Sequence, residues 1–406
     1  MPLVLAGDAP TVSGQARTAI EMLLVRVDTD AGVTGWGEGF GHRVWPATRT
    51  ALETMVAPLC IGRDPTAIRA LMNELMRALH GAGRSGPVLY ALSAIDIALW
   101  DIFGKATGQP VAQLLGGFSR RSIRTYNTCA GSSYMQEGGQ TVANYGLDKG
   151  RAAYADLDAF LHHADDLAEE LLESGITAMK IWPFDMAAEK SGGLYIGAAD
   201  MKAALSPFEK IRKRVGDRMD IMVEFHSMWQ LLPAIEIARE LAQFKTFWHE
   251  DPIRMDALGD LKRYADTSTA PLCASETLAS RWRFRELLET GAAGIVMLDL
   301  SWCGGISEAR KIAAMAEAWH LPVAPHDCTG PVVLTASTHL SLNAPNALVQ
   351  ESVRAFYNTW YPDVVTAVPR VSGGMISVPE GAGLGIELHP DLDRRFKTTR
   401  KVSEAN

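Results

Sequence analysis

Three glutamates stand at equal intervals in the second half of the chain: Glu224, Glu250 and Glu276. Each follows a short apolar run, and the interval fits one strand, one helix and two loops, which is the repeat of a parallel β/α barrel. Residues at the ends of successive barrel strands meet on one face of the barrel. Three carboxylates gathered there repel one another unless a cation neutralises them. The spacing therefore predicts a divalent metal site.

Further polar residues extend this series. Asp299, His326 and Glu351 each follow or close an apolar strand, and Lys180 ends an earlier one. An aspartate next to a histidine fixes the tautomer of the imidazole and raises its basicity. His226 lies two residues after the first glutamate of the series, so strand alternation predicts that both side chains point the same way. Residues of these types can hold a cation and move a proton.

These residues require a barrel to position them. From residue 122 the chain alternates between strands and helices, and we count eight strands between residues 123 and 350. The predicted strands include 123–128, 177–182 and 293–298, and the predicted helices include 154–174, 203–215, 229–244 and 311–319. A long polar loop, residues 131–151, lies on the expected active-site face, and loops of that length are usually functional or mobile.

The first part of the chain has a different pattern. A strand over 20–29 and a return strand starting at 35–38 precede three helices over 46–59, 65–79 and 86–106, which is an α+β pattern. The glycine-rich tail over 373–388 is expected to return to this part. We therefore predict a capping domain of residues 1–121 plus about 361–406, and a barrel domain of residues 122–360.

Composition excludes several classes of function. The chain has 406 residues, a net charge of −8, a pI near 5.7 and 47% hydrophobic residues, which argues against binding to nucleic acid or anionic membranes. No apolar stretch is expected to reach the length of a membrane span, and no secretory signal is visible. The five cysteines are scattered and odd in number, which is typical of reduced thiols in a cytoplasmic protein.

With these residues in order, the chain resembles the enolase superfamily, in its mandelate racemase-like branch. The resemblance rests on the three glutamates, the Asp299/His326 pair, Glu351 and Lys180. Supporting stretches lie at residues 93–101, 250–253 and 378–385. It implies a (β/α)7β TIM-like barrel with an α+β capping domain, with Mg²⁺ held by the glutamates. It also implies a homo-oligomer, from dimer to octamer, and removal of a proton α to a carboxylate through a metal-stabilised enediolate.

Two departures from the family pattern favour one of the reactions that the family catalyses over another. Lys180-Ile181-Trp182 stands where the branch often has Lys-x-Lys, so the second lysine base of a racemase is missing. Glu224-Phe225-His226 stands where aspartate and asparagine are usual, and this acid-x-His arrangement resembles the acid-sugar (galactonate-type) dehydratases. The family therefore implies a dehydratase of a sugar acid, an aldonate or aldarate.

The expected mechanism assigns a role to each residue. His326, oriented by Asp299, removes the C2 proton, while Lys180 and Glu351 hydrogen-bond or neutralise the enediolate. His226 protonates the departing 3-hydroxyl group to give a 2-keto-3-deoxy acid. The sequence leaves open whether the two histidines exchange roles, and which sugar acid and C2 configuration are used. Candidate specificity residues are the 8–15 segment, His42-Arg43 and Arg84.

Three alternatives stay open. The nearest is a racemase or epimerase on the same scaffold, with the two histidines on opposite faces of the substrate. A retaining glycoside hydrolase would use strand-end glutamates without a metal and would give Asp299 and His326 no role. A non-catalytic sugar-acid binding protein would bind the ligand without turnover.

Overall fold

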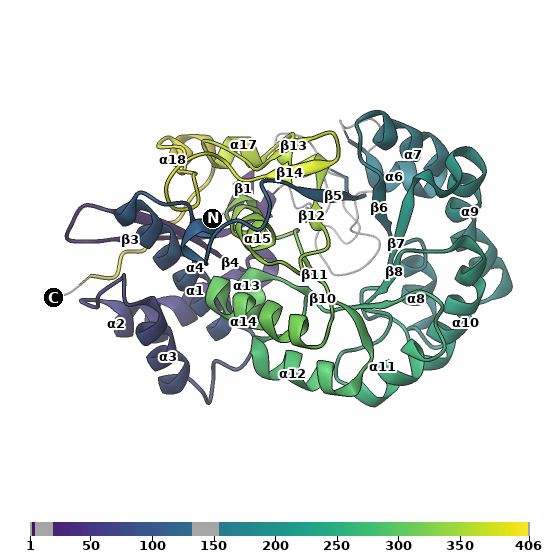
Figure 1. Ribbon diagram of the computed structural model, residues 1–406, viewed down its shortest axis with the longest axis horizontal. Coiled ribbons are helices and arrows are strands. Elements are labelled where there is room, and N and C mark those ends of the chain that lie inside the picture. The colour runs from purple at the N-terminus through teal and green to yellow at the C-terminus, as the bar shows by residue number, and fades with distance from the viewer. Residues whose placement is uncertain (1, 5–18, 132–153, 405–406) are drawn as a thin grey trace.

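A computed structural model describes residues 2–4, 19–131 and 154–404. Its larger part is a barrel of parallel strands surrounded by helices, and its smaller part packs against one side of that barrel (Figure 1). The predicted (β/α)7β barrel with an α+β cap is confirmed. The predicted loop over 131–151 and the 8–15 segment lie almost entirely outside the described residues.

Eight parallel strands form the barrel in chain order, and each pairs with the next from β5 to β11, while β12 pairs with β5. A parallel bridge between Val323 and Ala347 closes the ring. The strands are β5 (Ile123–Thr128), β6 (Ala178–Ile181), β7 (Asp220–Glu224), β8 (Trp248–Glu250), β9 (Leu272–Ala274), β10 (Ala293–Leu298), β11 (Val323–Pro325) and β12 (Gln350–Ser352).

Helices cover the outer face of the barrel, as a parallel sheet requires. They are α6 (Asp156–His162), α7 (Ala164–Glu173), α8 (Asp185–Ser191), α9 (Ala198–Val215), α10 (Leu231–Leu241), α11 (Leu258–Ala265), α12 (Ser280–Thr290), α13 (Leu300–Cys303), α14 (Gly305–Ala318), α15 (Pro331–Asn343), α16 (Arg354–Tyr357) and α17 (Tyr361–Val364). The single helix predicted over 154–174 is wrong, because His163, at φ −135° and ψ 43°, interrupts it and separates α6 from α7.

In the described residues, the cap combines two antiparallel strand pairs with helices, toward the left of Figure 1. Its elements are β1 (Pro2–Val4), β2 (Ala19–Glu21), β3 (Leu23–Asp28), β4 (Thr34–Gly39), α1 (Trp45–Ala51), the π-helical turn Leu52–Val56, α2 (Ala57–Cys60), α3 (Ile68–Ala78), α4 (Pro87–Thr107) and α5 (Val111–Leu114). The strand predicted over 20–29 is divided at Met22, and the helix predicted over 46–59 contains the π turn.

Close packing of β4 on α4 explains the glycine pattern of the cap. A Cβ atom on Gly37 would lie 1.9 Å from the carbonyl oxygen of Ala94, so only glycine lets the strand approach the helix this closely. Glu38 points the other way, and its buried carboxyl accepts the N–H groups of Val332 and Val333 in the first turn of α15. The carboxyl therefore links the cap to the barrel.

The helix α4 is longer and more apolar than the composition led us to expect of any segment. It is 21 residues long, and an 18-residue window within it has a mean hydropathy of 1.4, so the expectation that no apolar stretch reaches the length of a membrane span is wrong on length. However, 78% of that stretch is buried inside the protein. Because the helix packs against β4, α1 and α14, its apolar surface belongs to the protein core.

The C-terminal segment contacts both parts of the molecule. Its short elements are β13 (Arg370–Ser372), β14 (Met375–Ser377) and α18 (Leu392–Arg395). Asp101 of α4 accepts the N–H of Leu384 at 2.8 Å, which attaches the segment to the cap. The strand β14 pairs antiparallel with β5 of the barrel. The predicted return to the first domain is present, together with this second attachment.

Candidate functional site

Strand alternation places the polar residues directly above an apolar plug inside the barrel. The plug is a cluster of buried residues contributed by every strand or its immediate flank: Tyr126, Ala178, Met222, Trp248, Cys273, Ile295, Met297, Ala324 and Val349. Lys180, Glu224, Glu250 and Glu351 each come two residues after a member of this cluster, so they share its side of the strand. They therefore gather at the carboxyl ends of the strands, inside the barrel.

The three predicted metal ligands do come together. Glu224, Glu250 and Glu276 each offer one carboxylate oxygen, and these three oxygens lie within 4.8 Å of one another. Glu224 and Glu250 are buried, whereas Glu276 is partly exposed. Burial raises the pKa of Glu224 to about 7, although a hydrogen bond to Glu250 and the charge of Lys180 oppose the shift. Such oxygens are the donors that Mg²⁺ prefers.

Lys180 lies among the carboxylates as a buried cation. Its Nζ is 2.7 Å from Glu250 Oε1, 2.8 Å from Glu351 Oε1 and 3.6 Å from Glu224 Oε2. Burial lowers the pKa of Lys180, but these carboxylates more than offset it, so the pKa is raised well above its ordinary value. The lysine therefore stays charged, and its shorter contacts are with Glu250 and Glu351 rather than Glu224.

Asp299 and His326 form the predicted pair across β10 and β11. Asp299 Oδ2 lies 2.8 Å from His326 Nδ1, and Asp299 Oδ1 accepts the backbone N–H and the hydroxyl of Ser301. The other ring nitrogen, Nε2, lies 2.7 Å from Glu276 Oε2. The histidine is therefore held by its aspartate on one side and faces the carboxylate cluster on the other.

The charges around this pair act on both partners. Burial lowers the pKa of His326, but Glu276 and Glu351 more than offset it, so the pKa is raised well above its ordinary value. Burial raises the pKa of Glu276, but the neighbouring His326 outweighs this and the net pKa falls to about 2. With the carboxylates unneutralised, His326 is therefore held as an imidazolium.

Glu351 lies in the middle of β12 and is fully buried. It accepts hydrogen bonds from the Thr128 hydroxyl and from the backbone N–H of Asp327, and it pairs with Lys180. Burial raises its pKa, but Lys180 and His326 reverse the shift, so the net pKa is lowered. The carboxylate is a fixed anion in the floor of the site.

His226 lies in a turn after β7, and not on the strand as predicted. The strand β7 ends at Glu224, and His226 and Ser227 have left-handed backbone conformations with φ of 47° and 56°. The strand alternation that predicted the direction of the His226 side chain therefore ends before this residue. The turn is held because Glu224 Oε1 accepts the N–H of His226 at 2.6 Å.

His226 has a partner, Asp185, that the sequence pattern did not predict. Asp185, the first residue of α8, places its Oδ2 2.6 Å from His226 Nδ1 and is fully buried. Burial lowers the pKa of His226, but the charge of Asp185 outweighs this and the net pKa is raised. The available signal was an aspartate shortly after Lys180, in the loop that leaves the second strand of the barrel.

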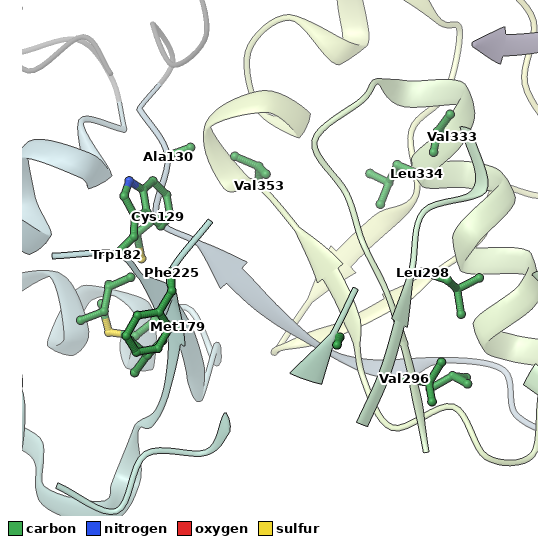
Figure 2. Packing of buried hydrophobic residues seen from close by; sticks show 14 of the residues in the cluster. Cys129, Ala130, Met179, Trp182, Phe225, Val296, Leu298, Val333, Leu334 and Val353 are labelled. Atoms are coloured by element: carbon green, nitrogen blue, oxygen red, sulfur yellow. The ribbon is translucent and has the colours of Figure 1, made fainter. Parts of the chain in front are cut away.

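Trp182 fills the wall between these residues. It is buried, and its ring stacks edge-on with Phe160 at 5.1 Å and with His226 at 5.7 Å between centroids. Figure 2 shows Trp182 with Met179 and Phe225 on one side of the buried cluster, and Val296 and Leu298 on the other. An indole in this position cannot take a proton, and it restricts the ring of His226.

The cap contributes one predicted candidate near the site. His42 has φ 43°, packs edge-on against Phe40, and hydrogen-bonds to the backbone of Cys328. Burial lowers its pKa to about 4, so the ring is neutral, and the charges of Asp299 and His326 act on it. Arg84 is exposed in the loop between α3 and α4.

Comparison with known proteins matches both parts of the chain. The family described as mandelate racemase / muconate lactonizing enzyme, N-terminal domain, matches residues 7–116. The family described as enolase C-terminal domain-like matches residues 163–392.

Several known proteins are similar over almost the whole length. A D-galactonate dehydratase from Xanthomonas campestris pv. campestris (strain B100) is 33% identical over 92% of this chain and 90% of its own. A D-xylonate dehydratase from Haloferax volcanii is 30% identical over 91% of this chain and 84% of its own. The crystal structure of an enolase of the mandelate racemase subgroup from Agrobacterium tumefaciens is 60% identical, with a TM-score of 0.83 and 95% of each chain covered. The chain therefore belongs to the enolase superfamily, in its mandelate racemase-like branch.

Proposed function

We propose that this protein is a Mg²⁺-dependent dehydratase that converts a sugar acid into a 2-keto-3-deoxy acid. One observation carries the proposal: the Asp299–His326 pair faces the carboxylate cluster, with His326 Nε2 2.7 Å from Glu276 Oε2. A base next to a set of metal ligands suits the removal of a proton beside a carboxylate, which is only weakly acidic.

The donor set fits a divalent cation. The three oxygens lie within 4.8 Å of one another, and burial raises the pKa of Glu250 well above its ordinary value, with the charge of Glu224 adding to the shift. Lys180 alone leaves this cluster with more negative than positive charge. Bound Mg²⁺ would supply positive charge that stabilises the negative charge of the enediolate.

His326 acts as the base in this proposal. Asp299 holds Nδ1–H, which directs the lone pair of Nε2 toward the C2 proton of the substrate. Nε2 contacts Glu276 at 2.7 Å, and with the carboxylates unneutralised the ring is an imidazolium, so this contact has to break and Nε2 has to release its proton before it can accept one from C2. The C2–H electron pair then enters the enediolate, and the proton resides on His326.

His226 completes the elimination. As the C3–O bond breaks, a proton from His226 converts the leaving hydroxyl group into water, and the enol product tautomerises to the keto acid. Lys180 is a hydrogen-bond donor for the carboxylate end of the substrate, and Glu351 keeps the lysine charged and in place. Each acid or base step contributes about 10²–10⁴ in rate.

The names of the relatives support the substrate class that we propose. The proteins named D-galactonate dehydratase and D-xylonate dehydratase act on aldonates. Each of them is similar to more than nine-tenths of this chain. We extend that class to this protein as an aldonate or aldarate. His42 of the cap, with its neutral ring near Asp299 and His326, is the described cap residue that we place beside the substrate.

A screen of aldonates and aldarates with Mg²⁺ tests the proposal. We expect at least one acid to give a 2-keto-3-deoxy acid, detected with a keto-acid reagent, and the activity to disappear with EDTA and return with Mg²⁺. Hydrolysis of a glycoside that resists EDTA, with no keto acid from any sugar acid, would favour a glycoside hydrolase. Tight binding of an acid with no turnover, unchanged in His326→Asn, would favour a binding protein.

A second candidate is an epimerase, and the placement of two Asp–His pairs supports it. Asp185–His226 lies at β6 and β7, and Asp299–His326 lies at β10 and β11, so two bases could address opposite faces of C2. Incubation in D₂O separates the two reactions. Deuterium incorporation with inversion and without keto acid would establish the epimerase and contradict the dehydratase.

A further inference from the structure

We infer that Asp185 is a positioning residue that fixes the ring of His226 for proton transfer through Nε2. The inference rests on the proposed function, because it deepens the role of His226 in the elimination. Asp185 is not among the residues on which the resemblance to the family rests.

The geometry of the pair repeats that of the base. Asp185 Oδ2 lies 2.6 Å from His226 Nδ1, and Asp299 Oδ2 lies 2.8 Å from His326 Nδ1. In both pairs the aspartate is fully buried behind the histidine, with side-chain exposures of 1% for Asp185 and 0% for Asp299. A carboxylate on Nδ1–H sets the tautomer and leaves Nε2 as the nitrogen that transfers the proton.

The backbone of His226 alone does not orient its ring. Its φ of 47° is held by the N–H contact with Glu224, and the following N–H of Ser227 donates to the carbonyl of Asp251 at 2.7 Å. These contacts fix Cα, whereas the side chain still rotates about two bonds. Trp182 restricts one edge of the ring, and Asp185 selects the orientation.

The location of Asp185 explains how it stays in place. It begins α8, and the ring of the preceding Phe184 stacks on Phe225 at 5.7 Å between centroids and 11° between planes. Phe225 is the residue before His226, so the two partners are carried by neighbours that pack together. A substitution of Asp185 therefore keeps the contact between Phe184 and Phe225 that brings the two loops together.

The first test separates the two halves of the reaction. The enzyme with Mg²⁺ is incubated in D₂O with D-galactonate and with D-xylonate, and deuterium at C2 of recovered substrate and keto acid are both measured. In Asp185→Asn we expect kcat for the keto acid to fall about 10²-fold with little change in KM. We expect C2 exchange to stay within about threefold of wild type, since His326 is untouched, whereas His326→Asn loses both.

A matched control makes the same chemical change outside the site. Asp200 pairs with Lys190 of α8 at 3.0 Å on the surface, so Asp200→Asn removes a carboxylate that contacts the same helix. We expect this variant to behave as wild type in both measurements. If Asp185→Asn keeps both steps within about threefold of wild type, the inference is wrong.

The remaining outcomes are also decisive. Loss of both steps with the rise in Tm caused by Mg²⁺ retained would still make Asp185 a positioning residue, with His226 as the base, because elimination requires that the C2 proton is removed first. Equal loss of both steps, together with loss of the rise in Tm caused by Mg²⁺, would mean that Asp185 holds the fold of the metal site, and would overturn the inference. Wild-type enzyme that neither exchanges nor eliminates with any acid of the panel contradicts the proposed function instead.

A second measurement needs no substrate. In ¹⁵N-histidine NMR of the Mg²⁺-loaded enzyme, the His226 signals are identified by their absence in His226→Asn. We expect Nδ1 to carry a proton in the wild type, and the Nδ1 signal to shift in Asp185→Asn but not in Asp200→Asn. Unchanged His226 signals in Asp185→Asn would contradict the inference even if the substrate is not among the acids tested.

Discussion

At the scale of single residues, the site is a set of buried charges that compensate one another. Lys180 contacts Glu250 and Glu351 within 2.8 Å, and His326 contacts Glu276 within 2.7 Å. Burying a charge is costly unless a partner of opposite sign accompanies it. Each charged group therefore depends on another, and removing one changes the behaviour of its neighbours.

Replacement of the proposed base, His326, gives the most direct prediction at the scale of residues. We expect His326→Asn to lower keto-acid formation at least about 10³-fold and to abolish C2 deuterium incorporation, because both need the same proton transfer. His320→Asn is the control, since His320 is exposed and its left-handed φ of 58° suits asparagine. Retained deuterium incorporation in His326→Asn would show that another residue is the base.

Removal of the buried cation tests the charge compensation. We expect Lys180→Met to destabilise the metal-free protein by about 3–5 kcal/mol, because Glu250 and Glu351 lose their nearest positive partner. Denaturant unfolding with and without Mg²⁺ measures the effect. A free energy of unfolding equal to that of wild type in the absence of Mg²⁺ would contradict this view of Lys180.

At the scale of elements, loops at the carboxyl ends of the strands position the second histidine, and one carboxyl joins the cap to the barrel. The turn after β7 and the start of α8 bring His226 and Asp185 together. On the other side, Glu38 of β4 accepts two N–H groups at the start of α15, and burial raises its pKa to about 8, although those hydrogen bonds oppose the shift. The contact between cap and barrel is therefore sensitive to pH.

The sign of this pH dependence follows from the raised pKa. The folded protein holds a proton on Glu38 up to about pH 8, whereas the unfolded chain releases it near 4.5. The stability that this proton brings is fully present below pH 4.5 and is lost as the pH rises through 8. We expect Glu38→Gln, which cannot ionise, to reduce the fall in unfolding free energy between pH 5.5 and 8 by up to about 1.4 kcal/mol per pH unit.

Urea unfolding of wild type and Glu38→Gln at several pH values measures the two slopes. Other titrating groups contribute equally to both proteins, so the difference between the slopes reports Glu38. Identical slopes would mean that Glu38 is ionised in the folded protein.

At the scale of the whole molecule, the cap contacts the barrel beside the site, where His42 hydrogen-bonds to the backbone of Cys328. The C-terminal segment holds the two parts together, since Leu384 donates to Asp101 of the cap and β14 pairs with β5. The domain boundaries, the oligomeric state and the cytoplasmic location stay predictions. The proposed metal binding would link the site to the stability of the entire fold.

Mg²⁺ should stabilise the whole protein, because it binds three folded-state carboxylates that repel one another in its absence. At a Mg²⁺ concentration about 100 times the dissociation constant, we expect a gain of about 2.7 kcal/mol, measured as a rise in Tm over EDTA-treated protein. Glu276→Gln should lose most of this rise. The same rise in the variant as in wild type would show that the cation binds elsewhere.

The sequence alone determined the barrel, the cap and most of the site, because these depend on local periodicity. Carboxylates recurring at the interval of a β/α unit must meet on one face of a barrel, so Glu224, Glu250 and Glu276 were predictable together. The pair Asp299–His326 was predictable for the same reason, since each residue follows the end of a neighbouring strand.

Only the tertiary structure decided how the second histidine is held. The contacts of His226 with Asp185 and of Ser227 with Asp251 join residues distant in sequence, which periodicity does not encode. The rest of α8, the helix α9 and the strand β7 separate Asp185 from His226, and no repeat in the sequence links the two residues. The packing of Phe184 on Phe225 brings the two together, so this pair depends on the folded core rather than on the repeat.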